Sequence, residues 1–537
     1  MLRMKRYVLF LLSLMSGILL AVSWPVNGIT LLVFVGFVPL LIVQQEVGDN
    51  HKKGMFWYAF TSFFIWNILT TWWIWNSTVG GAIAAWVLNS VFMAVVFYLF
   101  HISKVKLFNN KRGNAILLFY WISWEYFHSN WDLTWPWLNL GNVFASKPAW
   151  IQWYEYTGIF GGTAWVLIIN FLIFTVYRSL KYNDNIRAYI NASGVLLLII
   201  LPLWFSHNVY NNYTEKVSPV EVVVIQPNID PYNEEYELPA EVILKRNLNL
   251  AKPLITDSTD FLISPESAIQ EGFWEHLIAY SKSVTTIKRF IKPYKKLAYV
   301  IGGHTWRKIK KEEKKTNAAR KFRNGNWYYY SYNTAFLIDN SDSIQIHHKS
   351  KLTPGVEKMP SWWILKPLEK LAIDLGGTVG SLGSDDKVVV FKPAYNNVIV
   401  GPVICYESVY GEYVAKEVDK GAQLIFVITN DGWWGNTPGH RQHLLFSVLR
   451  AIETRRSVAR SANTGISAII NQRGDVLKQT KYWEQAAFKA VINKNDKKTF
   501  YVIYGEFIAR ISLFVSALVF LISITQGFLK KKKSPVA

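Results

Sequence analysis

Long apolar stretches, separated by short polar connections, dominate the first 206 residues and return after residue 505. A helix needs about 20 apolar residues to cross a bilayer, because each residue advances it by about 1.5 Å. Eight stretches approach this length and predict spans over residues 7–24, 29–44, 55–75, 81–101, 114–128, 158–177, 188–206 and 506–528. The fifth is the shortest and contains Glu125. The pattern predicts a multi-pass α-helical membrane bundle of about eight spans.

Lys and Arg residues are distributed unevenly among the short connections. Sixteen of them lie at the amino terminus, after the second, fourth and sixth stretches and in the tail, whereas the other connections contain only Lys147. Because positive side chains are enriched in cytoplasmic loops, we expect both termini in the cytoplasm and the polar region outside it. The first stretch is too long for a signal peptide, lacks a small-residue cleavage site and precedes further spans.

The pattern changes between residues 207 and 504. Short β-branched stretches predict strands there, and amphipathic stretches over 239–252 and 274–292 predict helices. The candidate strands cover residues 221–226, 260–263, 298–302, 334–338, 397–405 and 424–429. Such alternation is typical of an α/β domain. We therefore expect a membrane domain (1–206), an extracytoplasmic catalytic domain (207–504), an eighth span (505–529) and a basic cytoplasmic tail (530–537).

Composition and charge agree with this division. Of 537 residues, 51% are hydrophobic and only 18% are charged, below the roughly 25% usual in soluble domains. The formal charge of +21 could indicate a nucleic-acid partner, but much of the Lys and Arg lies in clusters between apolar stretches. Membrane topology explains those clusters, so we expect no nucleic acid among the partners.

Three reactive side chains each follow a strand-like stretch. Glu266 comes after an apolar run, Cys405 ends another, and Lys349 and Lys351 lie in an extended segment. A carboxylate can accept the proton of a thiol, and an ammonium can stabilise the thiolate or an oxyanion. The alternatives are a surface glutamate, a basic edge strand and an inert buried thiol, and spacing alone does not decide between them.

Metal and cofactor chemistry has little support in the sequence. Cys405 is the only cysteine, which excludes an intrachain disulfide and a multi-cysteine metal site. His440 and His443 could ligate a metal, but no third ligand is evident, and neither an HExxH motif nor a phosphate-binding glycine motif occurs. We expect no metal and no cofactor.

The order of Glu266, Lys349 and Cys405 resembles the Glu-Lys-Cys triad of the carbon–nitrogen hydrolase (nitrilase) superfamily. The resemblance extends to Asn-Asp-Gly-Trp-Trp-Gly at 430–435, Gln-His at 442–443, Arg-Ala-Ile-Glu at 450–453 and Arg-Ser-Ala-Asn-Thr-Gly-Ile-Ser at 460–467. With the apolar stretches, the whole chain is similar to the apolipoprotein N-acyltransferase family. This resemblance implies an αββα sandwich for the catalytic domain.

The resemblance also implies site residues. It makes Glu266 the general base, Cys405 the nucleophile and Lys349 the third member, with supporting positions at Glu357, Tyr406 and Glu407. Lys351 stands where the family has a histidine and remains the alternative lysine, although the eight-residue spacing to the supporting glutamate favours Lys349. Substrate-facing lips are expected at Trp362, Trp363, Trp433 and Trp434, unless these are ordinary core or interfacial aromatic residues.

The implied reaction moves a fatty acyl chain from a phospholipid to the α-amine of the diacylglyceryl-cysteine of an apolipoprotein, through a Cys405 thioester. The expected partners are the phospholipid donor, the apolipoprotein acceptor and the bilayer, for a monomer in the bacterial inner membrane with a periplasmic catalytic domain. One alternative is a membrane-tethered amidase that hydrolyses small amides. Another is a transporter or receptor with an inactive sensor domain, for which Glu125 is the notable intramembrane charge.

Overall fold

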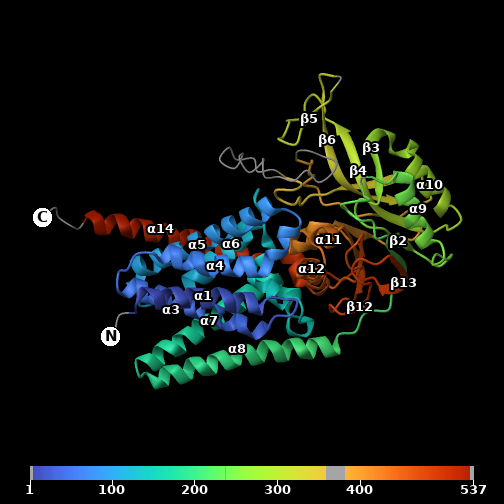
Figure 1. The fold of residues 1–537 in the computed structure, drawn as a ribbon. Helices are drawn as coiled ribbons and strands as arrows, with labels where there is room; N and C mark the ends of the chain where they lie inside the picture. Colours follow the sequence, from blue (N-terminus) through green and yellow to red (C-terminus); the bar gives the residue numbers. More distant parts are fainter. Residues whose placement is uncertain (1–3, 236, 324, 359–380, 533–537) are drawn as a thin grey trace. The chain divides into compact units, whose positions relative to one another are not determined.

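The computed structural model describes residues 4–235, 237–323, 325–358 and 381–532. Contacts divide the chain into two compact units (Figure 1). The first comprises Met1–Trp75, Val79–Asn211 and Glu506–Ala537, and the second comprises Asn76–Thr78 and Asn212–Gly505. Each unit has its own packed interior.

The first unit is helical. Its helices are α1 (Arg6–Ser23), α2 (Val33–Gly36), α3 (Val38–Asp49), α4 (Met55–Thr71), α5 (Val79–Phe108), α6 (Ala115–His128), α7 (Tyr154–Lys181), α8 (Asn185–Asn212) and α14 (Phe507–Lys532). Among the described residues, six segments are long and apolar enough to cross a membrane: Arg6–Ser23, Thr30–Asp49, Val79–Phe108, Tyr154–Lys181, Asn185–Asn212 and Phe507–Gln526. The helices at the third and fifth predicted spans, α4 and α6, have only 17 and 14 residues.

The acidic side chain in the fifth predicted span is engaged inside the helical unit. Glu125 is buried on α6, where its Oε1 accepts hydrogen bonds from Trp121 Nε1 (3.0 Å) and the Leu140 amide (2.7 Å). Its Oε2 accepts a hydrogen bond from Thr163 Oγ1 at 2.7 Å. A buried carboxyl with three donors supports the packing of its neighbours. Glu125 therefore gives no reason to infer a transport path.

The second unit contains two β-sheets. The larger has the order β13–β1–β2–β4–β6–β5, with β3 beside β4 and β7 beside β6, and the smaller has the order β12–β11–β10–β9–β8. Larger-sheet strands are β1 (Pro219–Gln226), β2 (Phe261–Ile263), β3 (Ile269–Trp274), β4 (Ala298–Lys308), β5 (Arg320–Lys321), β6 (Tyr328–Ile338), β7 (Ile344–His348) and β13 (Ala486–Asn493). Smaller-sheet strands are β8 (Val400–Ile404), β9 (Leu424–Thr429), β10 (Val458–Ala462), β11 (Ala468–Ile470) and β12 (Val476–Gln479).

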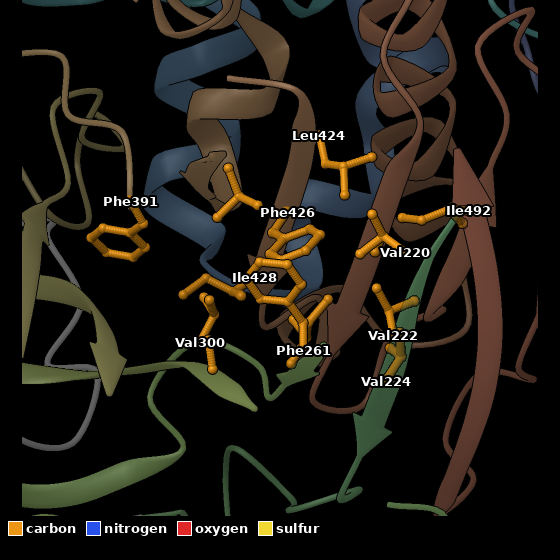
Figure 2. Packing of buried hydrophobic residues seen from close by; sticks show 14 of the residues in the cluster. Val220, Val222, Val224, Phe261, Val300, Phe391, Leu424, Phe426, Ile428 and Ile492 are labelled. Atoms are coloured by element: carbon orange, nitrogen blue, oxygen red, sulfur yellow. The ribbon is translucent and has the colours of Figure 1, made fainter. Parts of the chain in front are cut away.

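One apolar core joins the two sheets face to face. It takes alternate residues from β1, β2 and β4 and faces them with residues of β8 and β9. Figure 2 shows Phe261 and Phe426 meeting at its centre, with ring centroids 4.9 Å apart and ring planes at 80°. The period-2 alternation of the strands supplies one apolar face to this core and leaves the other for the helices.

Helices cover the outer faces of both sheets. The helices α9 (Ala240–Ala251) and α10 (Lys282–Ile291) pack on the larger sheet through a second apolar cluster (Figure 1). The helices α11 (Gly411–Asp419) and α12 (Pro438–Thr454) contact the smaller sheet. The result is helix, sheet, sheet, helix, so the predicted αββα sandwich is confirmed.

Several elements differ from the sequence prediction. The helix predicted over 274–292 is divided into a 3-10 helix, η6 (Glu275–Tyr280), and α10, because Ser281 caps α10 by accepting a hydrogen bond from the Val284 amide. The strands β4 and β6 also extend well beyond their predicted bounds, and their pairing runs from Tyr299 opposite Ile338 to Lys308 opposite Tyr329. The predicted stretch stopped short of Tyr330, Tyr332 and Asn333, which are buried in β6 although the local sequence there is polar and aromatic.

Replacing Phe426 by Ala should lower the free energy of unfolding by about 3–5 kcal/mol, because the cavity would open between the two sheets. Thermal unfolding of the detergent-purified protein measures the effect. Val242→Ala on the exposed side of α9 is the control, since Val242 is 42% exposed. Equal melting temperatures for the two variants would show that the inter-sheet core does not limit stability.

Candidate active site

The single cysteine lies at the end of β8, the last strand in the order of the smaller sheet. Cys405 follows β8 and opens a 3-10 helix, η8 (Cys405–Val409), with a backbone φ of +47°. This left-handed conformation costs a residue with a Cβ about 1–3 kcal/mol, so the surroundings must hold it. Ser408 Oγ donates to the Cys405 carbonyl at 2.7 Å, and His443 Nε2 lies 3.1 Å from the same oxygen. Cys405 as a whole residue is partly exposed.

Glu266 follows β2 in the larger sheet and is 8% exposed. Its Oε1 accepts hydrogen bonds from Asn333 Nδ2 (2.6 Å) and Lys349 Nζ (3.0 Å). Its Oε2 accepts a hydrogen bond from the Asn430 amide at 3.1 Å. Donors from both sheets therefore fix the orientation of this carboxylate.

A glycine allows the backbone of Glu266 to lie close to β4. A Cβ on Gly302 would stand 2.7 Å from Glu266 Cα and 2.9 Å from the Pro265 oxygen. The Gly302 amide also donates to that oxygen at 3.1 Å. Any larger residue would displace the turn that carries the carboxylate, because the nearest atoms belong to backbone.

Lys349 lies between two carboxylates just beyond the end of β7. It is 2% exposed, and its Nζ donates to Glu266 Oε1 (3.0 Å) and Glu357 Oε1 (2.8 Å). The Thr353 amide donates to Glu357 Oε2 at 2.9 Å. The Nζ of Lys351 instead stands 5.0 Å from the centre of the Tyr410 ring. The two lysines have separate partners, and Lys349 is the one that joins Glu266.

The charges around Cys405 and Lys349 determine which of these two side chains carries a proton at rest. Burial and then the negative charge of Glu266 raise the pKa of the Cys405 thiol, whereas Lys349 acts in the opposite direction. Burial lowers the pKa of Lys349, but Glu266, Glu357 and Cys405 outweigh it and raise the pKa well above the ordinary value. The resting site therefore holds a protonated thiol and a charged lysine, and reaction at sulfur requires a base.

Glu407 connects the end of β8, which carries Cys405, to the segment after β7. It is fully buried, and it accepts hydrogen bonds from the Ile404 amide (2.7 Å) and the Ser350 amide (2.6 Å). His347 Nε2 lies 3.2 Å from its Oε2. Tyr406 is also buried, next to Cys405. Because Glu407 holds residues on both sides of the site, it helps to set the separation of Cys405 and Lys349.

A buried ionic network lies next to Cys405. His443 Nδ1 stands 2.8 Å from Asp431 Oδ1, and Arg460 Nη2 donates to Asp431 Oδ2 at 2.5 Å. Potential ligand atoms of Cys405, Asp431 and His443 lie within 4.8 Å of one another. A metal fits this trio poorly, because Arg460 already neutralises Asp431. His440 does not belong to this trio. Its ring instead stacks on the Tyr482 ring, with the ring centroids 4.1 Å apart.

Sequence reasoning missed three polar residues of the site. Asn333 donates to both Glu266 and Glu357, but β6 was predicted to begin only after it. Asn430 begins the Asn-Asp-Gly-Trp motif, but sequence reasoning assigned it no role. Its side chain donates to the third missed residue, the buried Glu235. For Asn333 and Asn430 the available signal was a polar residue in a strand or directly after one, whereas Glu235 lies in a turn and no local signal marked it.

The predicted lip residues divide into two groups. Trp433 and Trp434 are half-buried in the turn after β9, and the ring of Trp433 lies 5.1 Å from that of Tyr232. Trp434 contacts the His443 ring, with centroids 5.6 Å apart. Trp362 and Trp363 lie outside the described residues.

The relatives found by sequence comparison cover more than nine-tenths of the chain. The chain is 27% identical over 528 residues to apolipoprotein N-acyltransferase of Chlorobaculum tepidum, with 96% of both chains covered. It is 26% identical to the protein of that name in Geobacter metallireducens, with 93% of this chain and 92% of the relative covered. Among solved structures, the nitrilase-superfamily member Nit3 of Saccharomyces cerevisiae matches 53% of this chain and 93% of its own, at 15% identity and a TM-score of 0.35.

Two family models match successive parts of the sequence. The apolipoprotein N-acyltransferase N-terminal domain matches residues 16–172. The carbon–nitrogen hydrolase model matches residues 222–496, which include Glu266, Lys349 and Cys405. The chain therefore belongs to the carbon–nitrogen hydrolase family, in the branch that joins this domain to an apolipoprotein N-acyltransferase N-terminal domain.

Proposed function

We propose that this chain transfers a fatty acyl group from a membrane phospholipid to the N-terminal α-amine of the diacylglyceryl-cysteine of a bacterial apolipoprotein. Near-complete coverage of relatives with that activity in their names supports the proposal. One observation carries it: Lys349 is buried between Glu266 and Glu357, and the charges of Lys349 and Glu266 both act on the Cys405 thiol. The same chain has six helices of membrane-spanning length among its described residues.

The first half-reaction forms a thioester. Glu266 accepts the Cys405 proton while the sulfur attacks the carbonyl carbon of a phospholipid ester. Lys349 and a backbone amide near Tyr406 stabilise the negative charge that develops on the carbonyl oxygen. The carbon–oxygen bond to the glycerol breaks, Glu266 returns the proton to the leaving oxygen, and lysophospholipid departs.

The second half-reaction uses the same groups in reverse. The neutral α-amine of the apolipoprotein attacks the thioester carbon, and Glu266 accepts a proton from the nitrogen. When the carbon–sulfur bond breaks, that proton returns to Cys405, and the product is an amide. The two substrates react with the enzyme in turn, so the kinetics should be ping-pong.

The proposed setting is the bacterial inner membrane. The shorter helices α4 and α6, added to the six helices of membrane-spanning length, give eight spans. An even number of spans puts both termini on the same side of the membrane. The excess of Lys and Arg in alternate connections assigns that side to the cytoplasm and the catalytic unit to the periplasm. We expect a monomer, with both lipid substrates reaching Cys405 from the bilayer.

Aromatic residues beside the site are proposed contacts for the acyl chains. Trp433 and Trp434 follow β9, whose end also carries Asn430, the donor to Glu266. Half-buried indole rings suit a surface with apolar lipid on one side and polar backbone on the other. Trp362 and Trp363 are further candidates for the same contact.

The thioester should be observable directly. Incubation of the purified protein with a defined phospholipid and no acceptor should add one acyl group to Cys405, visible as a mass increase equal to that chain. Addition of a diacylglyceryl lipopeptide should discharge it and acylate the peptide. Cys405→Ala should show neither event. An acylated peptide made by Cys405→Ala would disprove the covalent route.

Lys349 and Lys351 form a matched pair of variants. Lys349→Ala should reduce kcat by about 10²–10³-fold, because it removes a donor for the oxyanion, whereas Lys351→Ala should retain most activity. Lys349→Ala also leaves two buried carboxylates without their cation, so melting temperatures of both variants accompany the rates. Equal loss of activity at unchanged stability would mean that Lys351 shares the role.

Glu266→Gln should have opposite effects on thiol reactivity and on catalysis. Removing the negative charge lowers the pKa of Cys405, so iodoacetamide should alkylate Cys405 faster than in the wild type at the same alkaline pH. Acyl transfer should nevertheless fall by about 10²–10⁴-fold, because the base is lost. Slower alkylation in Glu266→Gln would contradict the charge arrangement. Lys349→Gln is the opposite control. It removes a positive charge that lowers the pKa of Cys405, so alkylation of Cys405 should be slower than in the wild type.

A further inference from the structure

A second carboxyl lies buried beside Glu266. Glu235 is 3% exposed in the turn that follows β1. Its Oε2 accepts a hydrogen bond from Asn430 Nδ2 at 2.8 Å, and its Oε1 accepts one from Gln270 Nε2 at 3.3 Å. Both of these donors are neutral amides, and the hydroxyl of Ser267 is a further neutral donor to the same carboxyl. Within the described part of the chain, no Lys or Arg forms an ion pair with Glu235.

Asn430 links this carboxyl to the reacting groups. Its backbone amide donates to Glu266 Oε2 at 3.1 Å, while its side chain donates to Glu235 Oε2 at 2.8 Å. The one residue therefore orients both carboxyls. The residues around Glu235 come from three other parts of the domain. Glu266 follows β2, Gln270 belongs to β3, and Asn430 follows β9.

The nearby charges do not offset a negative charge on Glu235. Arg246 of α9 pairs with Glu234 at 3.2 Å, and Asp230 in the same turn is itself acidic. Burial, and then the negative charge of Glu266, raise the pKa of Glu235 to about 8, against hydrogen bonds from Asn430 and Gln270. An isolated carboxylate is costly to bury, so Glu235 is protonated at neutral pH.

We propose that Glu235 is a positioning residue that acts through Glu266: its own charge sets how strongly Glu266 attracts the proton of Cys405. This inference rests on the proposed acyl transfer. During the attack, negative charge leaves Glu266 and appears on the oxyanion. A negative Glu235 beside Glu266 favours that displacement, whereas a neutral Glu235 does not.

The test follows thioester formation alone, so that the ionisation of the acceptor amine does not interfere. The full-length protein in detergent receives a defined phospholipid without acceptor, and the burst of lysophospholipid is timed at pH 7, at pH 9 and at several values between them. From pH 7 to pH 9 a group with a pKa of about 8 changes from mostly protonated to mostly ionised. The wild-type burst should accelerate more than that of Glu235→Gln, by a factor of about three or more.

Glu235→Gln has the shape of the protonated glutamate and cannot ionise. The matched control is Glu237→Gln, an exposed glutamate in the same segment, which should keep the wild-type ratio of the two rates. An equal ratio in Glu235→Gln and the wild type would overturn the inference. A protein that shows no burst in any form would instead refute the proposed acyl transfer.

A second variant covers the case in which Glu235→Gln is unstable. Melting temperatures show whether Glu235→Gln is stable. Glu235→Asp keeps an ionisable carboxyl, but the side chain is one methylene shorter. Glu235→Asp should retain an acceleration between pH 7 and pH 9, with a shifted midpoint. A pH dependence identical to the wild type in both midpoint and size would mean that the carboxyl at this position does not act on Glu266, and would also overturn the inference.

Discussion

The site depends on one buried cation held between two carboxylates. The Nζ of Lys349 donates to Glu266 and to Glu357, and all three side chains lie largely out of water. Burial by itself would disfavour the charged forms of Lys349 and Glu357, and the attraction between opposite charges keeps the pKa of Lys349 high and the pKa of Glu357 low. Without this arrangement the site would lose its fixed positive charge.

The same arrangement explains why the thiol can be inert at rest and reactive with substrate. Glu266 disfavours the thiolate of Cys405 by its charge but is also the group able to accept the proton. In the proposed acyl transfer, the negative charge passes from Glu266 towards the carbonyl oxygen near Lys349 when the proton moves. The proposed reaction would then create charge where the site already stabilises it, which is the general basis of electrostatic catalysis.

The sandwich brings these groups together through its strand ends. Glu266 follows β2 and Lys349 follows β7 in the larger sheet, whereas Cys405 follows β8 in the smaller. Packing of the two sheets around Phe261 and Phe426 thus sets the distance between residues far apart in the chain. Stability of the core and geometry of the site are consequences of the same contact.

Local sequence was sufficient for part of this picture. Apolar length predicted the six membrane-length helices, because spanning requires only hydrophobic residues in a row. Short β-branched stretches predicted β1, β9 and the first part of β4 for a similar reason. They did not predict the outer half of the β4–β6 ribbon, whose pairing depends on a partner strand more than on local pattern.

The sequence by itself determined the residue types of the site and their order, since a thiol, a carboxylate and an ammonium each follow an apolar strand. Only the tertiary structure decided that Lys349, and not Lys351, meets Glu266, because two residues of spacing separate the lysines while their partners come from distant strands. It also revealed Asn333 and Glu235, which matter through their neighbours. Such roles are absent from any local pattern, because burial and hydrogen bonding are properties of the folded chain.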